Sequence, residues 1–427
     1  MTLESRLLEA LSQWRQASAW RVAFSGGLDS TVLLHALVKL AERHRLPPIS
    51  AIHIHHGLQP AADAWPEHCR QFCAKLGVPL QIMQVQVRPG ASLEQAAREA
   101  RYAAFASSLT DGGLLLTAQH RDDQAETLLF RLMRGAGVRG LAAMPESRAL
   151  GSGRLLRPLL TVARSELESW ALEHQLQWVE DPSNQSIEHS RNFLRHQVMP
   201  VLEQRWPQAS GNMARAAAHL GEAQSLLDEL AEMDLKDAQG SPEWPWLPLP
   251  SLDLSMLRAL SPARQRNALR HWLSPLTRLP DTDHWAGWQA LRDAAEAATP
   301  CWRLAGGELH RAGNRLWWLS GPWLEPVAGE LAWPDTAAAL SLPANGSVSL
   351  EGAGPGAYRV GYRKGGEVMR LPGRGRRDLK RLFNESAVPG FLRSRWPLLY
   401  CEGELIAVAN LPYLNVTAVS FVWTPPA

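Results

Sequence analysis

The 427-residue chain lacks the features that mark disulfide-stabilised, secreted and membrane-spanning proteins. Its four cysteines are too few for a disulfide scaffold at this length, and none of them forms a C-x-x-C pair. No uninterrupted apolar run is long enough to cross a bilayer. Glu4 and Glu9 lie in an amphipathic helical pattern, which is not a secretory signal. We therefore expect a cytoplasmic protein with reduced thiols and no membrane association.

A strong overall charge is also absent. The 44 Lys and Arg residues nearly balance the 42 Asp and Glu residues, which leaves a formal net charge of +2. Any polyanionic partner must therefore be bound by a local basic patch. The hydrophobic share of 45% and the charged share of 20% are ordinary for globular proteins, and the length predicts two to four domains.

The most informative stretch is a six-residue turn. It consists of Ser25, Gly26, Gly27, Leu28, Asp29 and Ser30. Strand-forming residues precede it at 20–24, and apolar residues at helical spacing follow it at 31–41. Adjacent glycines let a backbone approach a ligand closely, and a helix start offers unpaired N–H groups. The turn predicts a nucleotide-phosphate site, with Asp29 placed to hold Mg²⁺.

Three other kinds of turn compete with this interpretation. A P-loop requires a Gly-Lys-Ser/Thr ending, and no lysine is present. A Rossmann fingerprint requires a third spaced glycine. An ordinary strand-to-helix turn with Asp29 and Ser30 as caps stays possible. The whole turn nevertheless resembles the SGGxDS motif of the PP-loop ATP pyrophosphatase superfamily, which implies ATP as the ligand.

Strand and helix patterns alternate after the turn. Expected strands are 49–55, 79–87 and 113–118, and expected helices are 62–76, 92–109 and 122–134. This alternation predicts a doubly wound parallel sheet of the α/β class. Ligands bind beyond the carboxyl ends of such strands, where Ser25, His53 and His120 fall.

A second motif follows the strand at 113–118. His120 is followed by Asp122, Asp123 and Glu126, and the last two share one face near a helix start. Acidic first turns are common because of the helix dipole alone. An imidazole and three carboxylates facing a phosphate site nevertheless form a candidate metal and general-base cluster.

Two segments are locally basic. Residues 131–164 contain seven arginines and one acid, and residues 363–395 contain ten Lys and Arg against three acids. Such runs are either solvated faces or binding sites for a polyanion. The candidate contacts to a nucleic acid are Arg131, Arg134, Arg191, Asn192, Arg195, Arg374, Arg376, Arg377, Lys380 and Arg381.

Taken together, the motifs resemble the tRNA(Ile)-lysidine synthetase family of PP-loop enzymes. The matching pieces are 25–30, 53–63, 98–102, 120–144, 181–200 and 380–389, in the family's order. Gln119 stands where many members have a second histidine, so we assign no catalytic role to it. The resemblance implies a PP-loop domain like the adenine nucleotide α-hydrolases at 1–215, a mainly helical tRNA-contacting domain at 216–325, and a small basic α+β domain at 350–427 that binds the acceptor stem.

The resemblance also implies the chemistry. Such enzymes use ATP and Mg²⁺ to join free L-lysine to carbon 2 of the wobble cytidine of a CAU-anticodon tRNA(Ile), through an adenylated cytidine, without an evident protein partner. The six-residue turn and His53 would bind ATP, and Asp29 the metal. Arg98 would stabilise the transferring phosphate. His120, Asp123 and Glu126 would supply the general base and bind lysine. The sequence leaves open which of them has which role.

Two alternative functions were considered. A PP-loop enzyme that thiolates a tRNA base needs paired cysteines or an iron–sulfur cluster, and no suitable pair is present. A tRNA-binding protein with a decayed active site would not be expected to keep the intact turn and the acidic cluster.

Overall fold

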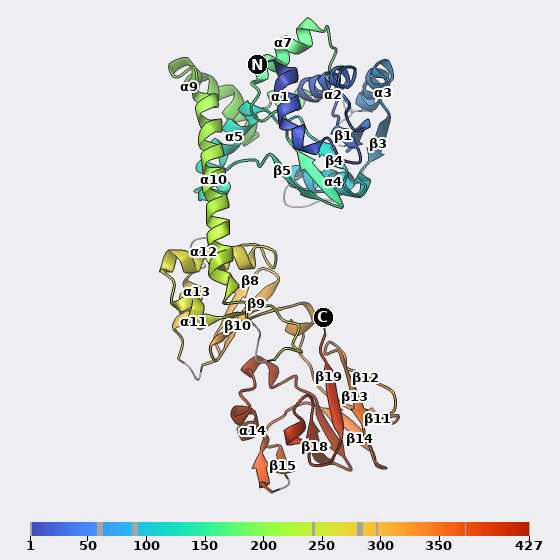
Figure 1. Ribbon diagram of the computed structural model, residues 1–427, viewed down its shortest axis with the longest axis vertical. Coiled ribbons are helices and arrows are strands. Elements are labelled where there is room, and N and C mark those ends of the chain that lie inside the picture. Colours follow the sequence, from blue (N-terminus) through green and yellow to red (C-terminus); the bar gives the residue numbers. More distant parts are fainter. Residues whose placement is uncertain are drawn as a thin grey trace. The chain divides into compact units, whose positions relative to one another are not determined.

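The computed structural model describes residues 2–57, 63–87, 93–240, 244–279, 285–295, 298–371 and 373–426 (Figure 1). The chain divides into two compact units, Met1–Ser225 and Leu226–Ala427. Within the described part of the chain, no helix is both long and apolar enough to span a membrane.

A six-stranded sheet lies at the centre of the first unit, in the order β3-β2-β1-β4-β6-β5. The strands are β1 (Trp20–Ala23), β2 (Ile49–His55), β3 (Leu80–Gln84), β4 (Leu114–Leu116), β5 (Ser147–Leu150) and β6 (Gly153–Leu156). Every neighbouring pair is parallel except β5 and β6, which form an antiparallel edge. The predicted α/β sheet is confirmed, and its antiparallel edge was not predicted.

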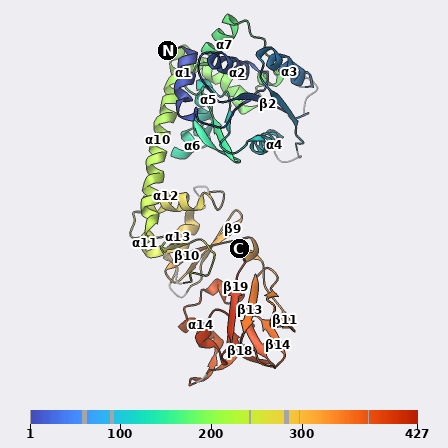
Figure 2. The same ribbon diagram turned by 45° about the vertical axis from the view of Figure 1, so that its right-hand side comes forward.

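Ten α-helices begin in the described residues of the first unit, and the last of them, α10, continues into the second unit. They are α1 (Leu3–Ala10), α2 (Leu28–Ala41), α3 (Trp65–Leu76), α4 (Leu93–Ser108), α5 (Arg121–Leu132), α6 (Val138–Leu141), α7 (Arg164–Glu173), α8 (Ser190–Phe193), α9 (Met199–Arg205) and α10 (Ala209–Lys236). Figures 1 and 2 show α2 and α3 on one face of the sheet and α4 on the other.

Both faces of the sheet are buried because its strands are apolar at successive positions. On β4, Leu114 and Leu116 join a core with residues of α1, α2, α3 and α7, whereas Leu115 joins a second core with Phe105 of α4. Successive strand residues point to opposite faces, so a strand that is apolar throughout must be covered on both sides. The leucines at 114–116 therefore account for the doubly wound arrangement.

The second unit begins with helices and a four-stranded antiparallel sheet in the order β7-β10-β9-β8. Its strands are β7 (Ser251–Asp253), β8 (Cys301–Leu304), β9 (Gly307–Ala312) and β10 (Arg315–Ser320), and its helices are α11 (Leu254–Arg258), α12 (Pro262–Leu273) and α13 (Ala286–Asp293). The region expected to be mainly helical therefore contains a complete sheet as well.

The rest of this unit is a small α+β region, as predicted. It contains α14 (Leu379–Glu385) and the strands β11 (Glu330–Trp333), β12 (Leu340–Ser341), β13 (Ser347–Glu351), β14 (Tyr358–Gly361), β15 (Val368–Leu371), β16 (Gly375–Asp378), β17 (Leu398–Cys401), β18 (Glu404–Val408) and β19 (Ser420–Thr424). The low-charge stretch before residue 350 supplies three of these strands. Trp333 and Val348 from that stretch pack in one core with Trp396 and Trp423.

One buried histidine in the first unit has a lowered pKa. His35 on α2 packs against α7, where the Trp170 indole N–H donates to His35 Nδ1 at 3.1 Å. The pKa of His35 is lowered to about 4, chiefly by burial and also by the nearby His174 and Lys39, with Glu42 opposing them. The native fold therefore holds this imidazole neutral.

We predict that His35 contributes stability at neutral pH that is lost in mild acid. Its pKa lies below the unfolded value of about 6.5, so the unfolded chain binds the proton first. The contribution is complete above pH ~6.5 and falls progressively toward pH ~4. In urea titrations, His35→Gln should lose less stability between pH 7.5 and pH 5 than the native chain. Equal losses in both proteins would contradict the prediction.

Candidate active site

A cleft of about 770 Å³ lies at the carboxyl ends of the parallel strands. Its walls come from the 25–30 turn, the end of β2, the start of α5 and the segment 178–185, with Arg195 at one side. The sheet order reverses between β1 and β4, since the chain continues from β1 to β2 and β3 before it returns to β4. Open α/β sheets bind ligands at such a reversal.

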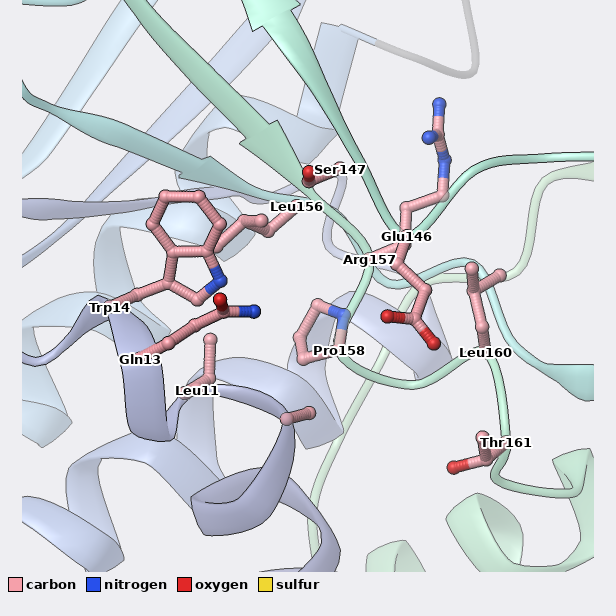
Figure 3. A pocket seen from close by; sticks show the side chains of 11 residues that line it. Leu11, Gln13, Trp14, Glu146, Ser147, Leu156, Arg157, Pro158, Leu160 and Thr161 are labelled. Carbon is pink, nitrogen blue, oxygen red and sulfur yellow. The ribbon is translucent and has the colours of Figure 1, made fainter. Parts of the chain in front are cut away.

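A second pocket in this unit is much smaller. It measures about 70 Å³ and lies between the end of α1 and the loop after β6 (Figure 3). Trp14, Glu146 and Pro158 contribute to its wall. None of the predicted catalytic residues lines it, so the larger cleft is the candidate active site.

The 25–30 turn is shaped by glycine and held by its own hydroxyl groups. Gly26 has φ +87°, and a Cβ atom there would lie 3.2 Å from Cys69 Sγ. The Ser25 and Ser30 hydroxyls lie 3.0 Å apart, and the Gly27 N–H donates to Ser25 Oγ at 3.3 Å. Because α2 begins at Leu28, its first N–H groups lie at this turn, as a phosphate site requires.

His120 connects this turn to the acidic cluster. It caps α5: its Nδ1 accepts from the Asp123 N–H at 3.4 Å, and its own N–H donates to Asp123 Oδ2 at 3.1 Å. Its Nε2 lies 3.5 Å from Asp123 Oδ2 and 3.8 Å from Asp29 Oδ2. The two motifs predicted separately from the sequence therefore meet at one imidazole.

Burial and neighbouring carboxylates set the protonation of this site. Burial lowers the pKa of His120, but hydrogen bonding to Asp122 and the charges of Asp123 and Asp29 outweigh it and raise the pKa above its usual value. Burial raises the pKa of Asp29, with His120 opposing it. For Asp122, burial is outweighed by His120 and by the Arg164 N–H, and the pKa falls to about 2.

Arg195 neutralises the deepest carboxylate. It lies in a π-helical turn, η4 (Leu194–Val198), and forms two hydrogen bonds to Glu126, Nε to Oε1 at 2.6 Å and Nη2 to Oε2 at 2.9 Å. Its Nη2 also donates to Asp123 Oδ1 at 2.9 Å. Burial still raises the pKa of Glu126, which is 3% exposed. The sequence had suggested an RNA contact for Arg195 and did not indicate this pairing.

Other predicted RNA contacts have partners inside the first unit. Arg191 donates to Thr127 Oγ1 at 2.7 Å, and Asn192 donates to the backbone oxygens of Ser183 and Ser186. Arg131 donates to the backbone oxygens of residues 140 and 143. These bonds order the segments around the cleft, and the RNA contacts stay predictions.

Arg98 lies beside the cleft rather than on its wall. Its guanidinium stacks on the Tyr102 ring at 4.8 Å, as does that of Arg148. Tyr102 and Arg101 line the cleft, and neither was singled out as a site residue. The motif at 98–102 did not indicate which of its members faces the cleft.

His53 lies deep in the cleft wall. It is 2% exposed, and its Nδ1 lies 2.9 Å from the Phe24 carbonyl oxygen. A carbonyl oxygen only accepts, so Nδ1 carries the proton and Nε2 is left as an acceptor. Nε2 has no hydrogen-bond partner among the described residues. Burial lowers the pKa of His53, which keeps the ring neutral.

The basic segment of the second unit is exposed. Arg376 and Arg377 lie on β16 next to α14, which carries Lys380 and Arg381. All four side chains are open to solvent, and Arg381 pairs with Glu385 at 3.1 Å. Arg374 lies in the turn before β16 and is also exposed.

Three segments of the chain match known protein-family domains. Residues 1–202 match the PP-loop domain, so the first unit is a nucleotide-binding domain of the PP-loop class. Residues 252–317 match the TilS substrate binding domain, and residues 358–418 match the TilS substrate C-terminal domain.

Curated relatives match over nearly the full chain. The tRNA(Ile)-lysidine synthase of Pseudomonas syringae pv. tomato is 64% identical over 97% of this chain and 93% of its own length. That of Pseudomonas aeruginosa is 59% identical, covering 99% of this chain and 97% of its own, and that of Escherichia coli O157:H7 is 42% identical, covering 94% and 95%. The chain belongs to the tRNA(Ile)-lysidine synthase family, which confirms the resemblance seen in the sequence.

The Arg195–Glu126 pair should be energetically coupled. Arg195→Gln leaves a buried carboxylate without its partner, and we expect a loss of roughly 2–4 kcal/mol of stability. Adding Glu126→Gln should restore part of this loss, because the orphaned charge is gone. Urea unfolding of both single variants and the double variant measures the coupling. Strictly additive losses would contradict the prediction.

Proposed function

We propose that the chain uses ATP to join free L-lysine to carbon 2 of the wobble cytidine in a CAU-anticodon tRNA(Ile), acting in the cytoplasm. The observation that carries the proposal is the meeting of a phosphate-binding turn and an acidic cluster at His120, in one cleft of a chain of this family. The first motif suits ATP, and the second suits an amine.

The proposed reaction has two steps. The oxygen on cytidine carbon 2 attacks the α-phosphorus of ATP, and pyrophosphate leaves. The lysine ε-amine then attacks carbon 2, AMP leaves with the oxygen, and the amine loses its extra protons. Backbone N–H groups at the start of α2 and the hydroxyls of Ser25 and Ser30 would hold the phosphates.

The charge of the cleft suits lysine. Around His120, the carboxyl groups of Asp29, Asp122, Asp123 and Glu126 outnumber Arg195, the arginine that pairs with two of them, which favours binding of an ammonium group there. Arg101 and Arg164 also line the cleft. A lysine amine is charged near neutral pH, so attack requires a base. Asp29 and His120 both have raised pKa values and lie beside each other, which suits proton transfer.

The residues of the cleft also fit Mg²⁺. Asp29 Oδ1 is buried without a hydrogen-bond partner among the described residues, and Mg²⁺ prefers such oxygen ligands. Asp29 would hold the ion at the mouth of the turn. A bound Mg²⁺ neutralises charge on the phosphates and on the leaving pyrophosphate.

The cysteines do not favour the thiolation alternative. The fold brings Cys69 directly behind the turn, 3.4 Å from His53 Nδ1, although it is distant in sequence. Burial raises the pKa of Cys69 to about 12 and that of Cys73 to about 11. A buried, protonated thiol is a poor nucleophile. The acidic cluster, in contrast, has a use in lysine binding and none in sulfur transfer.

Asp29→Asn tests the first step. The amide keeps the shape of the side chain but removes the metal-binding charge, so we expect pyrophosphate release with tRNA and lysine to fall by about 100-fold or more. Asp111→Asn, an exposed acid outside the cleft, serves as the control. Native rates in Asp29→Asn would contradict the assignment, provided that the native chain forms lysidine.

Lys380→Ala with Arg381→Ala tests the binding of tRNA by the second unit. Each lost phosphate contact should weaken tRNA binding and reduce the slope of log K against log salt by about one unit. The KM for ATP should stay unchanged. Lys39→Ala with Arg43→Ala removes the same charge at the end of α2 remote from the cleft and serves as the control. If the variant and the native chain bind tRNA with equal affinity, and log K falls with log salt at the same slope in both, this segment does not hold RNA.

A further inference from the structure

Three metal-ligating side chains lie together on one face of the β8–β9 hairpin. Cys301 on β8 is directly opposite His310 on β9, and Arg303 is directly opposite Glu308. Since alternate strand residues share a face, the side chains of 301, 303, 308 and 310 project from the same side. The hairpin therefore places a thiol, a carboxylate and an imidazole next to each other.

The distances between these groups are close to those around a single ion. The Cys301 Sγ lies 3.4 Å from Glu308 Oε2, and the His310 Nε2 lies 2.8 Å from the same oxygen. All three ligand atoms lie within 4.8 Å of one another. Zinc–ligand bonds of about 2.0–2.3 Å in a tetrahedron place neighbouring ligand atoms roughly 3.3–3.7 Å apart. Small side-chain rotations would therefore accommodate the ion.

Neighbouring residues already orient two of these ligands. Arg303 Nε donates to Glu308 Oε1 at 3.2 Å, which leaves Oε2 facing the other two groups. The Phe391 ring packs against the His310 imidazole with centroids 5.5 Å apart. Such supporting contacts orient the ligands of metal sites in general. Glu308 and His310 are half-buried, and Cys301 is exposed. A metal ion can therefore reach the three side chains from solvent.

We propose that Cys301, Glu308 and His310 form a Zn²⁺ site with a fourth position open to water. A thiolate together with an imidazole selects zinc or a similar transition metal over Mg²⁺ and Ca²⁺, which prefer oxygen ligands alone. Binding breaks the Cys301 S–H bond, forms the sulfur–zinc bond and releases the proton to solvent. The site shares no residue with the ATP and lysine cleft, and it does not depend on the proposed ligase function.

Without an ion, the same atoms form a closed polar group. Cys301 and His310 then both donate to Glu308, and every member has a partner. This is the alternative that the experiment must exclude.

Cobalt binding distinguishes a metal site from this metal-free polar group. Co²⁺ bound to a thiolate shows a charge-transfer band in the near ultraviolet, and Co²⁺ in a tetrahedral site shows strong absorption bands in the visible range. The full chain is freed of metal with a chelator and titrated with Co²⁺. We expect both bands to saturate at one Co²⁺ per chain, and Zn²⁺ to displace the cobalt and abolish them. Cys301→Ser should lose the charge-transfer band, and His310→Ala should lose the visible bands or weaken binding at least about tenfold.

Cys401→Ser is the matched control, since Cys401 is a half-buried cysteine in the same unit. This variant should bind Co²⁺ as the native chain does. Unchanged circular dichroism and ATP turnover would show that each variant is folded. The proposal is overturned if the native chain shows no thiolate band, if Cys301→Ser retains it, or if the band is lost in Cys401→Ser instead.

Discussion

The short approach between His120 and Asp29 is the contact on which the rest of the first unit depends. Asp29 follows β1 and His120 follows β4, and these strands are neighbours only because the sheet order reverses between them. Burial disfavours a charge on either group. Asp29 and Asp123 favour the charged form of His120, and His120 favours the charged form of Asp29, whereas the like charge of Asp123 opposes it. The sheet, the capping of α5 and the cleft can thus be understood as the support for one pair of titratable groups, the buried His120 and the partly exposed Asp29.

Much of this arrangement could be predicted from the sequence, because its signals are local. The 25–30 turn and the acidic first turn of α5 are short motifs, and the apolar 49–55 strand occupies the predicted residues. The pairing of Arg195 with Glu126 was not predictable in this way. The two residues are 69 positions apart, and no periodicity links them. The same holds for Cys69, which reaches the back of the turn only through the packing of α3.

In the second unit, the sequence predicted a mainly helical region at 216–325, and the structure adds a four-stranded sheet to it. The β8–β10 strands are short, and β9 carries polar residues at alternate positions, so their pattern resembles an isolated hairpin. The stretch before residue 350 is low in charge and rich in small residues, which is typical of a connection. Several of its apolar side chains, among them Trp333, Leu342 and Val348, are nevertheless buried in the core. Burial of single tryptophans contributes enough apolar area to make such a stretch part of a folded sheet.

The π-helical turn between α8 and α9 has a consequence for how this cleft can vary. A π turn contains one residue more than the α-helical turn it replaces, and Arg195 lies within it. Removing one of the other residues of this turn would convert it to α-helical geometry and change the position of Arg195 relative to α8 or α9. The guanidinium would then leave Glu126 without any change in its own identity. The charge balance of the cleft thus depends on the number of residues in this turn as well as on their identity. A deletion in the turn would remove the Arg195–Glu126 pair, as a substitution of Arg195 would.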